Sequence, residues 1–476
     1  MKRLLFAVLL LPLVVLSACS RSDTPRKIVI LSTNDIHAAI QNFPRLATAV
    51  EMCRDTAEVI LVDAGDRWTG NAYVDHAPEK CRPVIDLMNL LDYDVATLGN
   101  HEFDHGQQLL DQRIEQADFD VICANMSSST PYLHLDPTEI VECGGIRVGF
   151  VGLVTNFANG HPDGKEVNFE GLTFPSPFET AAEYQSLADQ CDLLVAITHI
   201  GSDMDTLLVD RAPGYDLIIG GHTHTVIPEG KTYGHTMITQ TGKSLKYIGA
   251  TEVEMRGDTI YRIYNRLIPL DGYAEDPQMK SLVEQYYNDP ELNKAIGSTE
   301  IQLDLVGLGN FMAAAITQAT DSQIGFYHFG GVRIDSLRKD SISIGDMYTL
   351  EPFSSTIYTV EMSGAQMREM IINKFNDTKN PKESHRPDLN PYGTSYTILT
   401  DENGNATDVR FDAVDYDKVY KVALCNYIYE NYRFDKSVPA DNTGILVTDV
   451  LCDQLRNSSP LKYDNRLAIT IEPQKR

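Results

Sequence analysis

The sequence lacks several features that mark common classes of protein. Its 476 residues contain no apolar run long enough to span a bilayer, no low-complexity tract, no internal repeat and no CxxC motif. Apolar residues make up 43% of the chain, which is typical of a globular protein. Positive charge is scarce: 40 lysines and arginines face 67 aspartates and glutamates, and the net charge is −27. Such an acidic chain repels a nucleic-acid backbone, so a nucleic-acid polymer is not an expected partner.

The first residues have the pattern of a secretory signal. Two basic residues precede an apolar run from Leu4 to Leu16, whose length suits a signal-peptide core and not a membrane span. The sequence LSAC, ending at Cys19, resembles the lipobox of bacterial lipoproteins. That resemblance implies loss of residues 1–18, lipidation of Cys19 and a polar tether over residues 19–26. We therefore expect an anchored protein that faces the periplasm or the cell exterior; a chance cysteine at an ordinary cleavage site is the alternative.

The remaining cysteines are few. Seven are left once Cys19 is lipidated, which is an odd number. A disulfide between Cys53 and Cys81 is one expectation in an oxidising compartment, although the sequence does not establish connectivity. We expect most of the others to pack as small buried hydrophobes.

The length of the chain predicts two domains, because one hydrophobic core rarely serves so many residues. From Lys27 onward, apolar β-branched runs alternate with amphipathic helical patterns, which predicts a layered α/β domain over residues 27–270. Residues 271–297 are rich in Glu, Asp, Tyr and Asn and predict a helical linker. A second α/β-like segment, residues 298–476, includes a strand-like run from Tyr420 to Glu430.

Candidate metal ligands stand at the ends of five predicted strands. Ligands bind beyond the carboxyl ends of strands in open α/β sheets, so we expect these residues to meet at one rim. Two i, i+2 pairs among them point the same way if their backbone is extended. The candidates are Asp35 and His37, Asp63 and Asp66, Asn100, His101, Glu102 and Asp104, His199, and His222 and His224.

This set of residue types suits a divalent metal centre. Carboxylate, imidazole and amide oxygen together favour an ion of the Zn, Mn, Co or Fe type. Seven of the candidates, namely four His, two Asp and one Asn, exceed the needs of one tetrahedral ion, which indicates two ions that share a carboxylate. For two of the acids another interpretation stays open. Asp63 would then only accept hydrogen bonds from backbone amides, and Glu102 would be a solvated acid in the first turn of a helix. Seven such residues at five strand ends are hard to explain as incidental caps.

The motifs NDIH, GD, GNHEFD, TH and GHTH, in this order, resemble the five blocks of the calcineurin-like metallophosphoesterases. CANM, followed by GLGNFMAAA, GGVR, EPF and NTG, narrows the resemblance to the bacterial 5′-nucleotidase and UDP-sugar hydrolase branch. The resemblance implies a four-layer α/β/β/α catalytic domain and a smaller α/β (α+β) substrate-binding domain. It also implies a hydrolase that uses two divalent ions. Its expected substrates are small phosphate esters, above all nucleotides.

Carried over by position, the resemblance implies a role for each residue of the centre. The first ion would be bound by Asp35, His37, Asp66 and His224. The second ion would be bound by Asp66, Asn100, His199 and His222, with Asp66 bridging. Two ions about 3.5–4 Å apart lower the pKa of a bound water and clamp an in-line displacement at phosphorus. His101 would donate to the developing oxyanion, oriented by Asp104.

In the second domain, the resemblance implies that Gly330, Gly331 and Arg333 bind phosphate, with a tight turn and an exposed arginine as the alternative. Phe353 and Tyr427 match two aromatics that sandwich the base in relatives, although both also suit a core. The chain departs from the family at four binding positions. An Arg, two Asn and an Asp of relatives are replaced by Gln302, His328, Ser355 and Arg433.

Three functions follow from these observations. The first is an extracytoplasmic phosphohydrolase that releases phosphate from nucleotides. The second is a phosphohydrolase for a non-nucleotide or cyclic phosphodiester substrate, which the four departures favour. The third is a catalytically silent, lipid-anchored binding protein. A binding protein has little reason to keep His101 and Asp104 beside a complete ligand set, which favours an enzyme.

Overall fold

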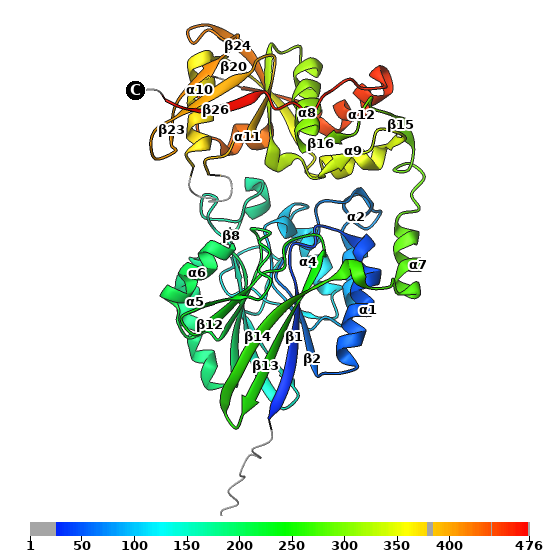
Figure 1. The fold of residues 1–476 in the computed structure, drawn as a ribbon, viewed down its shortest axis with the longest axis vertical. Helices are drawn as coiled ribbons and strands as arrows, with labels where there is room; N and C mark the ends of the chain where they lie inside the picture. Colours follow the sequence, from blue (N-terminus) through cyan, green and yellow to red (C-terminus); the bar gives the residue numbers. More distant parts are fainter. Residues whose placement is uncertain (1–24, 378–383, 439, 475–476) are drawn as a thin grey trace, which may run out of the picture.

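A computed structural model describes residues 25–377, 384–438 and 440–474 (Figure 1). The expected signal peptide and lipidated Cys19 lie outside these residues, and both stay predictions. Within the described part of the chain, no helix combines the length and the apolar character needed to cross a membrane.

The first half of the chain forms two six-stranded sheets that pack face to face. Apolar side chains of both inner faces share one core, with Ile30 and Val62 from one sheet and Phe150 and Val195 from the other. The first sheet has the order β14 (Thr259–Pro269), β13 (Tyr247–Arg256), β1 (Arg26–Thr33), β2 (Val59–Asp63), β3 (Val95–Ala96) and β4 (Asp120–Val121). The second has the order β11 (Lys231–Tyr233), β12 (Thr236–Thr239), β10 (Leu217–Gly220), β9 (Leu193–His199), β7 (Ile146–Val154) and β6 (Thr138–Cys143).

Helices cover the outer face of each sheet, as Figure 1 shows in the lower half of the molecule. Helices α1 (Phe43–Arg54), α3 (Arg82–Leu90) and α4 (Gln107–Glu115) share a core with the first sheet. Helices α5 (Pro177–Tyr184) and α6 (Ser202–Arg211) share another core with the second sheet. The predicted α/β/β/α layering is therefore confirmed.

Helix α7 (Pro277–Tyr286) leads from the first half of the chain to the second. Its Met279 and Val283 pack into the core that α1 shares with the first sheet. The strand β15 (Ala295–Gly297) then pairs with β19 (Ile342–Ser343). The predicted linker thus contains a helix that packs on the first domain.

The second half of the chain is a smaller α/β unit around one core. Its five-stranded sheet has the order β21 (Leu389–Tyr392), β17 (Ile324–His328), β24 (Val419–Cys425), β20 (Thr356–Ser363) and β25 (Ala440–Leu446). A three-stranded sheet contains β23 (Ala406–Phe411), β22 (Tyr396–Thr400) and β26 (Ile469–Pro473). The helices are α8 (Leu305–Ala319), α9 (Ile344–Leu350), α10 (Gly364–Phe375), α11 (Asn426–Asn431) and α12 (Val447–Ser458).

Two expectations from the sequence are wrong. The run from Tyr420 to Glu430 is not one strand, because β24 ends at Cys425 and α11 follows. Cys425 pairs with Ile357, the second residue of β20, so β20 offers almost no backbone partner beyond Cys425. The backbone groups that follow form hydrogen bonds within a helical turn instead. Cys53 and Cys81 form no disulfide, since both are free thiols.

Candidate metal centre and active site

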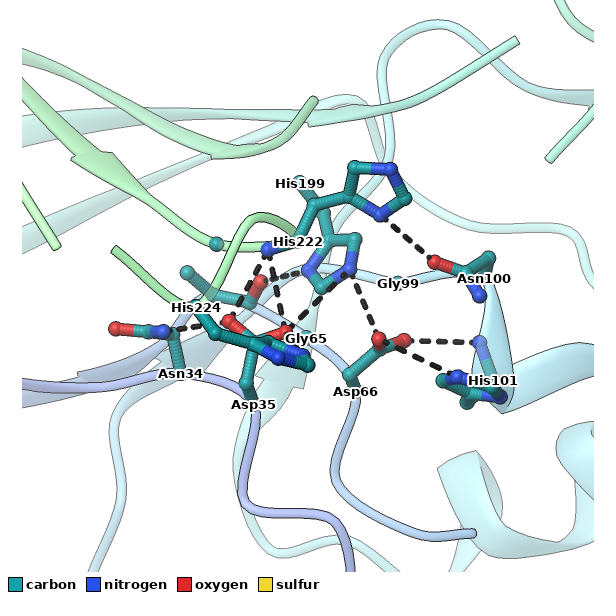
Figure 2. Close-up of polar contacts among 12 residues, drawn as sticks. Asn34, Asp35, Gly65, Asp66, Gly99, Asn100, His101, His199, His222 and His224 are labelled. Atoms are coloured by element: carbon teal, nitrogen blue, oxygen red, sulfur yellow. Dashed lines mark hydrogen bonds and ion pairs between the residues drawn. The ribbon is translucent and has the colours of Figure 1, made fainter. Parts of the chain in front are cut away.

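The predicted ligands converge where strands of both sheets end (Figure 2). They come from loops after β1, β2, β3 and β10 and from the last residue of β9, so the two sheets contribute to one centre. Six of the seven are labelled in Figure 2, and the seventh, His37, has its Nε2 2.9 Å from that of His224, although the set spans 190 positions of the sequence. The residues are Asp35, His37, Asp66, Asn100, His199, His222 and His224.

The backbone of these loops is not extended, which corrects the argument from the i, i+2 pairs. Five ligand candidates have positive φ angles: Asp35 (50°), His37 (46°), Asp66 (58°), His222 (78°) and His224 (51°). This left-handed conformation costs a non-glycine residue about 1–3 kcal/mol and persists only where the surroundings hold it. The side chains converge because the backbone turns sharply after each strand, and strained residues of this kind cluster at functional sites.

Asp35, His37 and His224 form one side of the centre. The Nε2 atoms of His37 and His224 lie 2.9 Å apart. Oδ1 of Asp35 lies 3.3 Å from Nε2 of His224 and 3.8 Å from Nε2 of His37. Two imidazole nitrogens and a carboxylate oxygen thus point at a common position.

Asp66 lies at the middle of the centre. Its Oδ2 is 3.1 Å from Nε2 of His199 and 4.0 Å from Nε2 of both His37 and His101. Its Oδ1 accepts a hydrogen bond from the backbone N–H of His101 at 2.8 Å. On the far side of His199, Nδ1 of His222 lies 3.0 Å from Oδ1 of Asn100 (Figure 2).

The chemistry of these donors fits a divalent cation. The carbonyl of Ala64 lies 2.7 Å from Nδ1 of His199, so Nδ1–H donates there and Nε2 faces the centre, as in metal sites where a backbone carbonyl sets the tautomer. Nδ1 of His37 lies 3.2 Å from both the Thr69 carbonyl and Nη2 of Arg333, and its Nε2 also faces the centre. Imidazole nitrogens that face one another beside two buried carboxylates have no better partner than a cation.

Electrostatics keep the carboxylates of the centre ionised. Burial raises the pKa of Asp66, but His199, His101 and His37 together bring it well below its ordinary value. Burial lowers the pKa of His199, whereas the carboxylates of Asp66 and Asp35 raise it to about 10. A cation that binds at Nε2 replaces the proton which His199 otherwise carries.

His101 and Asp104 form a pair beside this group. Nδ1 of His101 lies 2.7 Å from Oδ2 of Asp104, and both residues belong to the turn around the short helix η2 (His101–Phe103). Burial lowers the pKa of His101, but Asp66 and Asp104 raise it above its ordinary value. A protonated imidazole is therefore available as a donor, with its ring orientation set by Asp104.

Glu102 has a structural role that sequence reasoning missed. Glu102 is 1% exposed, so the interpretation as a solvated acid is wrong. Its carboxylate accepts hydrogen bonds from the backbone N–H groups of Asp66 (2.9 Å), Arg67 (2.8 Å) and Gly99. Asp63 also binds the backbone, because its carboxylate accepts a hydrogen bond from the N–H of Gly65 at 3.0 Å. The position of Glu102 and Asp63 inside the ligand motifs was the signal that they matter. The motif alone does not distinguish a metal ligand from a residue that holds the backbone of a ligand.

Two residues of the second domain reach the centre. Nη2 of Arg333 lies 3.2 Å from Nδ1 of His37, and its guanidinium lies 5.4 Å from the ring centroid of Phe353. The Phe353 ring stacks on His101, with centroids 5.9 Å apart. In the first domain, Nζ of Lys165 donates to the carbonyl of Phe353 at 3.1 Å.

The other candidates of the second domain lie around His328. Its ring stacks on Tyr427, with centroids 4.7 Å apart and planes 19° apart. A Cβ on Gly331 would lie 2.6 Å from Nε2 of His328, so this glycine is required by packing, whereas a Cβ on Gly330 would lie 3.3 Å from Nδ1 of the same ring. Arg433 and Tyr427 line a cleft between the domains that also contains His222 of the centre.

The remaining departures from the family lie away from this cleft. Ser355 is buried, and its backbone N–H lies 3.4 Å from the Glu351 carboxylate. Gln302 is exposed, and its carbonyl accepts from Asn465 at 3.2 Å. Neither side chain lines the cleft beside the centre.

Comparisons with known proteins agree with this geometry. Residues 28–226 match the family model of the calcineurin-like phosphoesterases, and residues 291–433 match the 5′-nucleotidase C-terminal domain. The chain is 25% identical to a trifunctional nucleotide phosphoesterase of Bacillus subtilis over 95% of its own length, but spans only 35% of that protein. It is 24% identical to the silent protein UshA(0) of Salmonella typhimurium, with 92% of each chain covered. Its fold is similar to that of a 5′-nucleotidase precursor from Thermus thermophilus, with TM-score 0.80, 21% identity and coverage of 94% and 99% of the two chains.

Proposed function

Because the chain belongs to the calcineurin-like phosphoesterases and carries a 5′-nucleotidase C-terminal domain, we propose that it releases phosphate from nucleotides outside the cytoplasm. It is a metal-dependent phosphoester hydrolase, and the proposal concerns its substrate, its location and the roles of its residues. The observation that carries the proposal is the position of Asp66, whose carboxylate contacts His199 at 3.1 Å and faces His37 at 4.0 Å.

Asp66 is suited to bridge two divalent ions. The first ion would be bound by Asp35, His37, Asp66 and His224, and the second by Asp66, Asn100, His199 and His222. When bound, two such ions supply an activated water and neutralise charge on the phosphoryl oxygens.

The other residues position the substrate and stabilise charge. The Arg333 guanidinium is a planar fork that suits two phosphoryl oxygens, and it reaches the centre from the second domain. His101, protonated and oriented by Asp104, directs Nε2 toward the centre and donates to the oxyanion that develops at phosphorus. Glu102 acts through others, since it holds the backbone that carries Asp66 and Gly99.

A phosphate-release assay tests this proposal. With added Mn²⁺ or Co²⁺ we expect release from AMP and UMP, loss of release with a chelator, and recovery on metal readdition. Asp66→Asn should lose both release and bound metal, because the shared ligand loses its charge. Absence of release from a broad substrate panel by the metal-loaded protein would favour a binding role instead.

A second candidate function is hydrolysis of phosphate esters other than simple nucleoside 5′-monophosphates. His328 covers one face of Tyr427, so that face is not open to a nucleobase. At the cleft, Arg433 stands where relatives carry an acid that binds ribose. Equal rates on AMP, UMP and a generic aryl phosphate would support this candidate, and a strong preference for nucleotides would exclude it.

We also propose that Cys19 anchors the protein in the membrane of the cell envelope. The support is the LSAC motif after an apolar run and a short polar tether. Metabolic labelling with a fatty-acid analogue should mark the wild type and not Cys19→Ser. Labelling of both chains would contradict the anchor at this position.

A further inference from the structure

A second group of metal-ligating side chains lies outside the centre described above. It contains Asp75, Cys81 and His105, whose potential ligand atoms all lie within 4.8 Å of one another. Asp75 ends the short helix α2 (Ala72–Asp75), Cys81 precedes α3, and His105 lies between η2 and α4. None of the three takes part in the proposed hydrolysis.

Each member of this group presents an atom that a cation would satisfy. Nε2 of His105 is buried and has no hydrogen-bond partner among the described residues. A buried nitrogen without a partner is unfavourable, because it has lost its hydrogen bonds to water. Cys81 is a free thiol with 0% exposure. Asp75 is equally buried, and its carboxylate oxygens still have lone pairs beyond those used by three backbone N–H groups.

Charged groups of both signs surround the cluster. Burial and the carboxylates of Asp75, Asp104 and Glu102 raise the pKa of the Cys81 thiol well above its ordinary value, whereas Arg113 lowers it, and Lys80 and Lys165 act on His105. A bound cation would stabilise the thiolate that burial disfavours. Arg113 does not prevent metal binding, because its positive charge favours the thiolate that a metal requires.

The donor set determines the kind of ion. A thiolate, an imidazole and a carboxylate together favour a borderline-soft ion of the Zn²⁺ type over Mg²⁺, Ca²⁺ or Mn²⁺. The catalytic centre differs, because all of its candidate ligands offer nitrogen or oxygen. We propose that Asp75, Cys81 and His105 bind a third divalent ion of the Zn²⁺ type, which is not catalytic.

An ion at this position would connect two loops of the catalytic centre. Asp75 holds the backbone of Thr69, Gly70 and Asn71, and the carbonyl of Thr69 contacts Nδ1 of His37. His105 directly follows Asp104, the partner of His101. The third ion would therefore fix the turn that carries the catalytic pair relative to the loop that orients a metal ligand.

Cobalt(II) spectroscopy tests the inference independently of hydrolysis. The purified chain is freed of metal and loaded with Co²⁺. A thiolate-to-cobalt charge-transfer band in the near ultraviolet can arise only at a cysteine, because the catalytic centre contains none. We expect this band in the wild type and in Asp66→Asn, and its loss in Cys81→Ser together with one fewer cobalt ion per chain.

Three further variants keep the test decisive if Cys81→Ser folds poorly. Cys81 has a φ of 64°, a conformation that glycine adopts readily, so Cys81→Gly removes the thiol and relieves the backbone. Cys123→Ser is the matched control, because Cys123 is also buried but lies outside the group. It should keep the band, and His105→Ala should weaken it.

Two outcomes would overturn the inference. One is a wild-type protein whose catalytic centre takes up cobalt without any thiolate band. The other is a band that survives in both Cys81→Ser and Cys81→Gly, which would assign it to another cysteine. Neither outcome depends on whether the protein releases phosphate, so failure of the proposed function would be seen separately.

Discussion

His37 and His199 each use one ring nitrogen to contact a main-chain carbonyl, that of Thr69 and that of Ala64. The other nitrogen of each ring is thereby directed into the centre. Asp104 orients His101 in a similar way, although a carboxylate takes the place of the carbonyl. At the scale of single residues, the backbone and one acid thus determine which atoms are available for chemistry.

The role of His101 can be separated from metal binding. We expect His101→Ala to lower kcat by about 10²–10³-fold, because it removes one donor to the developing oxyanion. Bound metal should stay unchanged, since His101 is not among the proposed ligands. Phosphate release and elemental analysis of the same samples measure the two effects. Loss of metal in this variant would contradict the assignment.

Glu102 should affect stability as well as activity. In Glu102→Gln, the acceptors for the N–H groups of Asp66 and Arg67 become weaker, so we expect a loss of about 1–3 kcal/mol in unfolding free energy. Metal affinity should fall too, because the loop of Asp66 becomes less ordered. Chemical denaturation and metal titration measure these changes. The exposed Glu115→Gln is the control, and equal stability of the two variants would refute the role of Glu102.

At the scale of elements, the ends of β9 and β10 are joined to α6 by Asp205. This carboxyl is fully buried and accepts a hydrogen bond from the Thr198 hydroxyl at 2.6 Å. A Cβ on Gly220, the last residue of β10, would lie 2.3 Å from the Asp205 carboxylate. The helix and the two strand ends are therefore closely packed just behind His199.

The stability of this region should depend on pH. Burial raises the pKa of Asp205 to about 8, from 3.8 when the chain is unfolded. Between these values the folded state holds a proton that the unfolded state has released, so stability falls as pH rises. The side chain of Asp205→Asn cannot ionise. Between pH 5 and pH 8 we therefore expect the unfolding free energy of this variant to rise relative to that of the wild type by about a few kcal/mol.

Denaturation at several pH values, with the same metal concentration for each chain, measures this difference. Asp210→Asn changes an exposed carboxyl on the same helix and should follow the wild type. If Asp205→Asn also parallels the wild type across this range, Asp205 is ionised in the folded protein.

At the scale of the whole molecule, the candidate active site contains residues of both domains. Arg333 and Phe353 of the second domain reach His37 and His101 of the first. Beside this contact, Lys165 of the first domain donates a hydrogen bond to the carbonyl of Phe353 in the second domain. Substrate binding should therefore depend on a residue that touches neither metal nor phosphate.

We expect Lys165→Ala to raise KM by about tenfold, because loss of one charge-assisted hydrogen bond weakens the contact between the domains. Bound metal should not change, and kcat should fall less than KM rises. Lys246→Ala is the control, since the ion pair of Lys246 with Asp335 at 3.9 Å also joins the two domains but is exposed and therefore weak. A fall in kcat at constant KM would place Lys165 in the chemical step instead.

Much of the catalytic domain could be predicted from the sequence. Alternating apolar strands and amphipathic helices predicted the layers, and polar residues at strand ends predicted where the candidate ligands converge. These inferences depend on local periodicity, which each segment of the chain carries by itself. Three features could not be predicted, because each depends on segments that are distant in the sequence. They are the hydrogen bonds of Glu102, the absence of a Cys53–Cys81 disulfide and the stacking of His328 on Tyr427.

The types of residue at the candidate metal centre, and the order of the strands that supply them, follow from the sequence alone. The directions of those side chains depend on the folded chain, in which left-handed turns at Asp35, Asp66 and His222 replace the extended backbone that spacing suggested. The fold also brings Asp75, Cys81 and His105 together. The physical reason is that donor chemistry belongs to each residue, whereas the direction of a side chain depends on backbone turns that distant contacts hold in place.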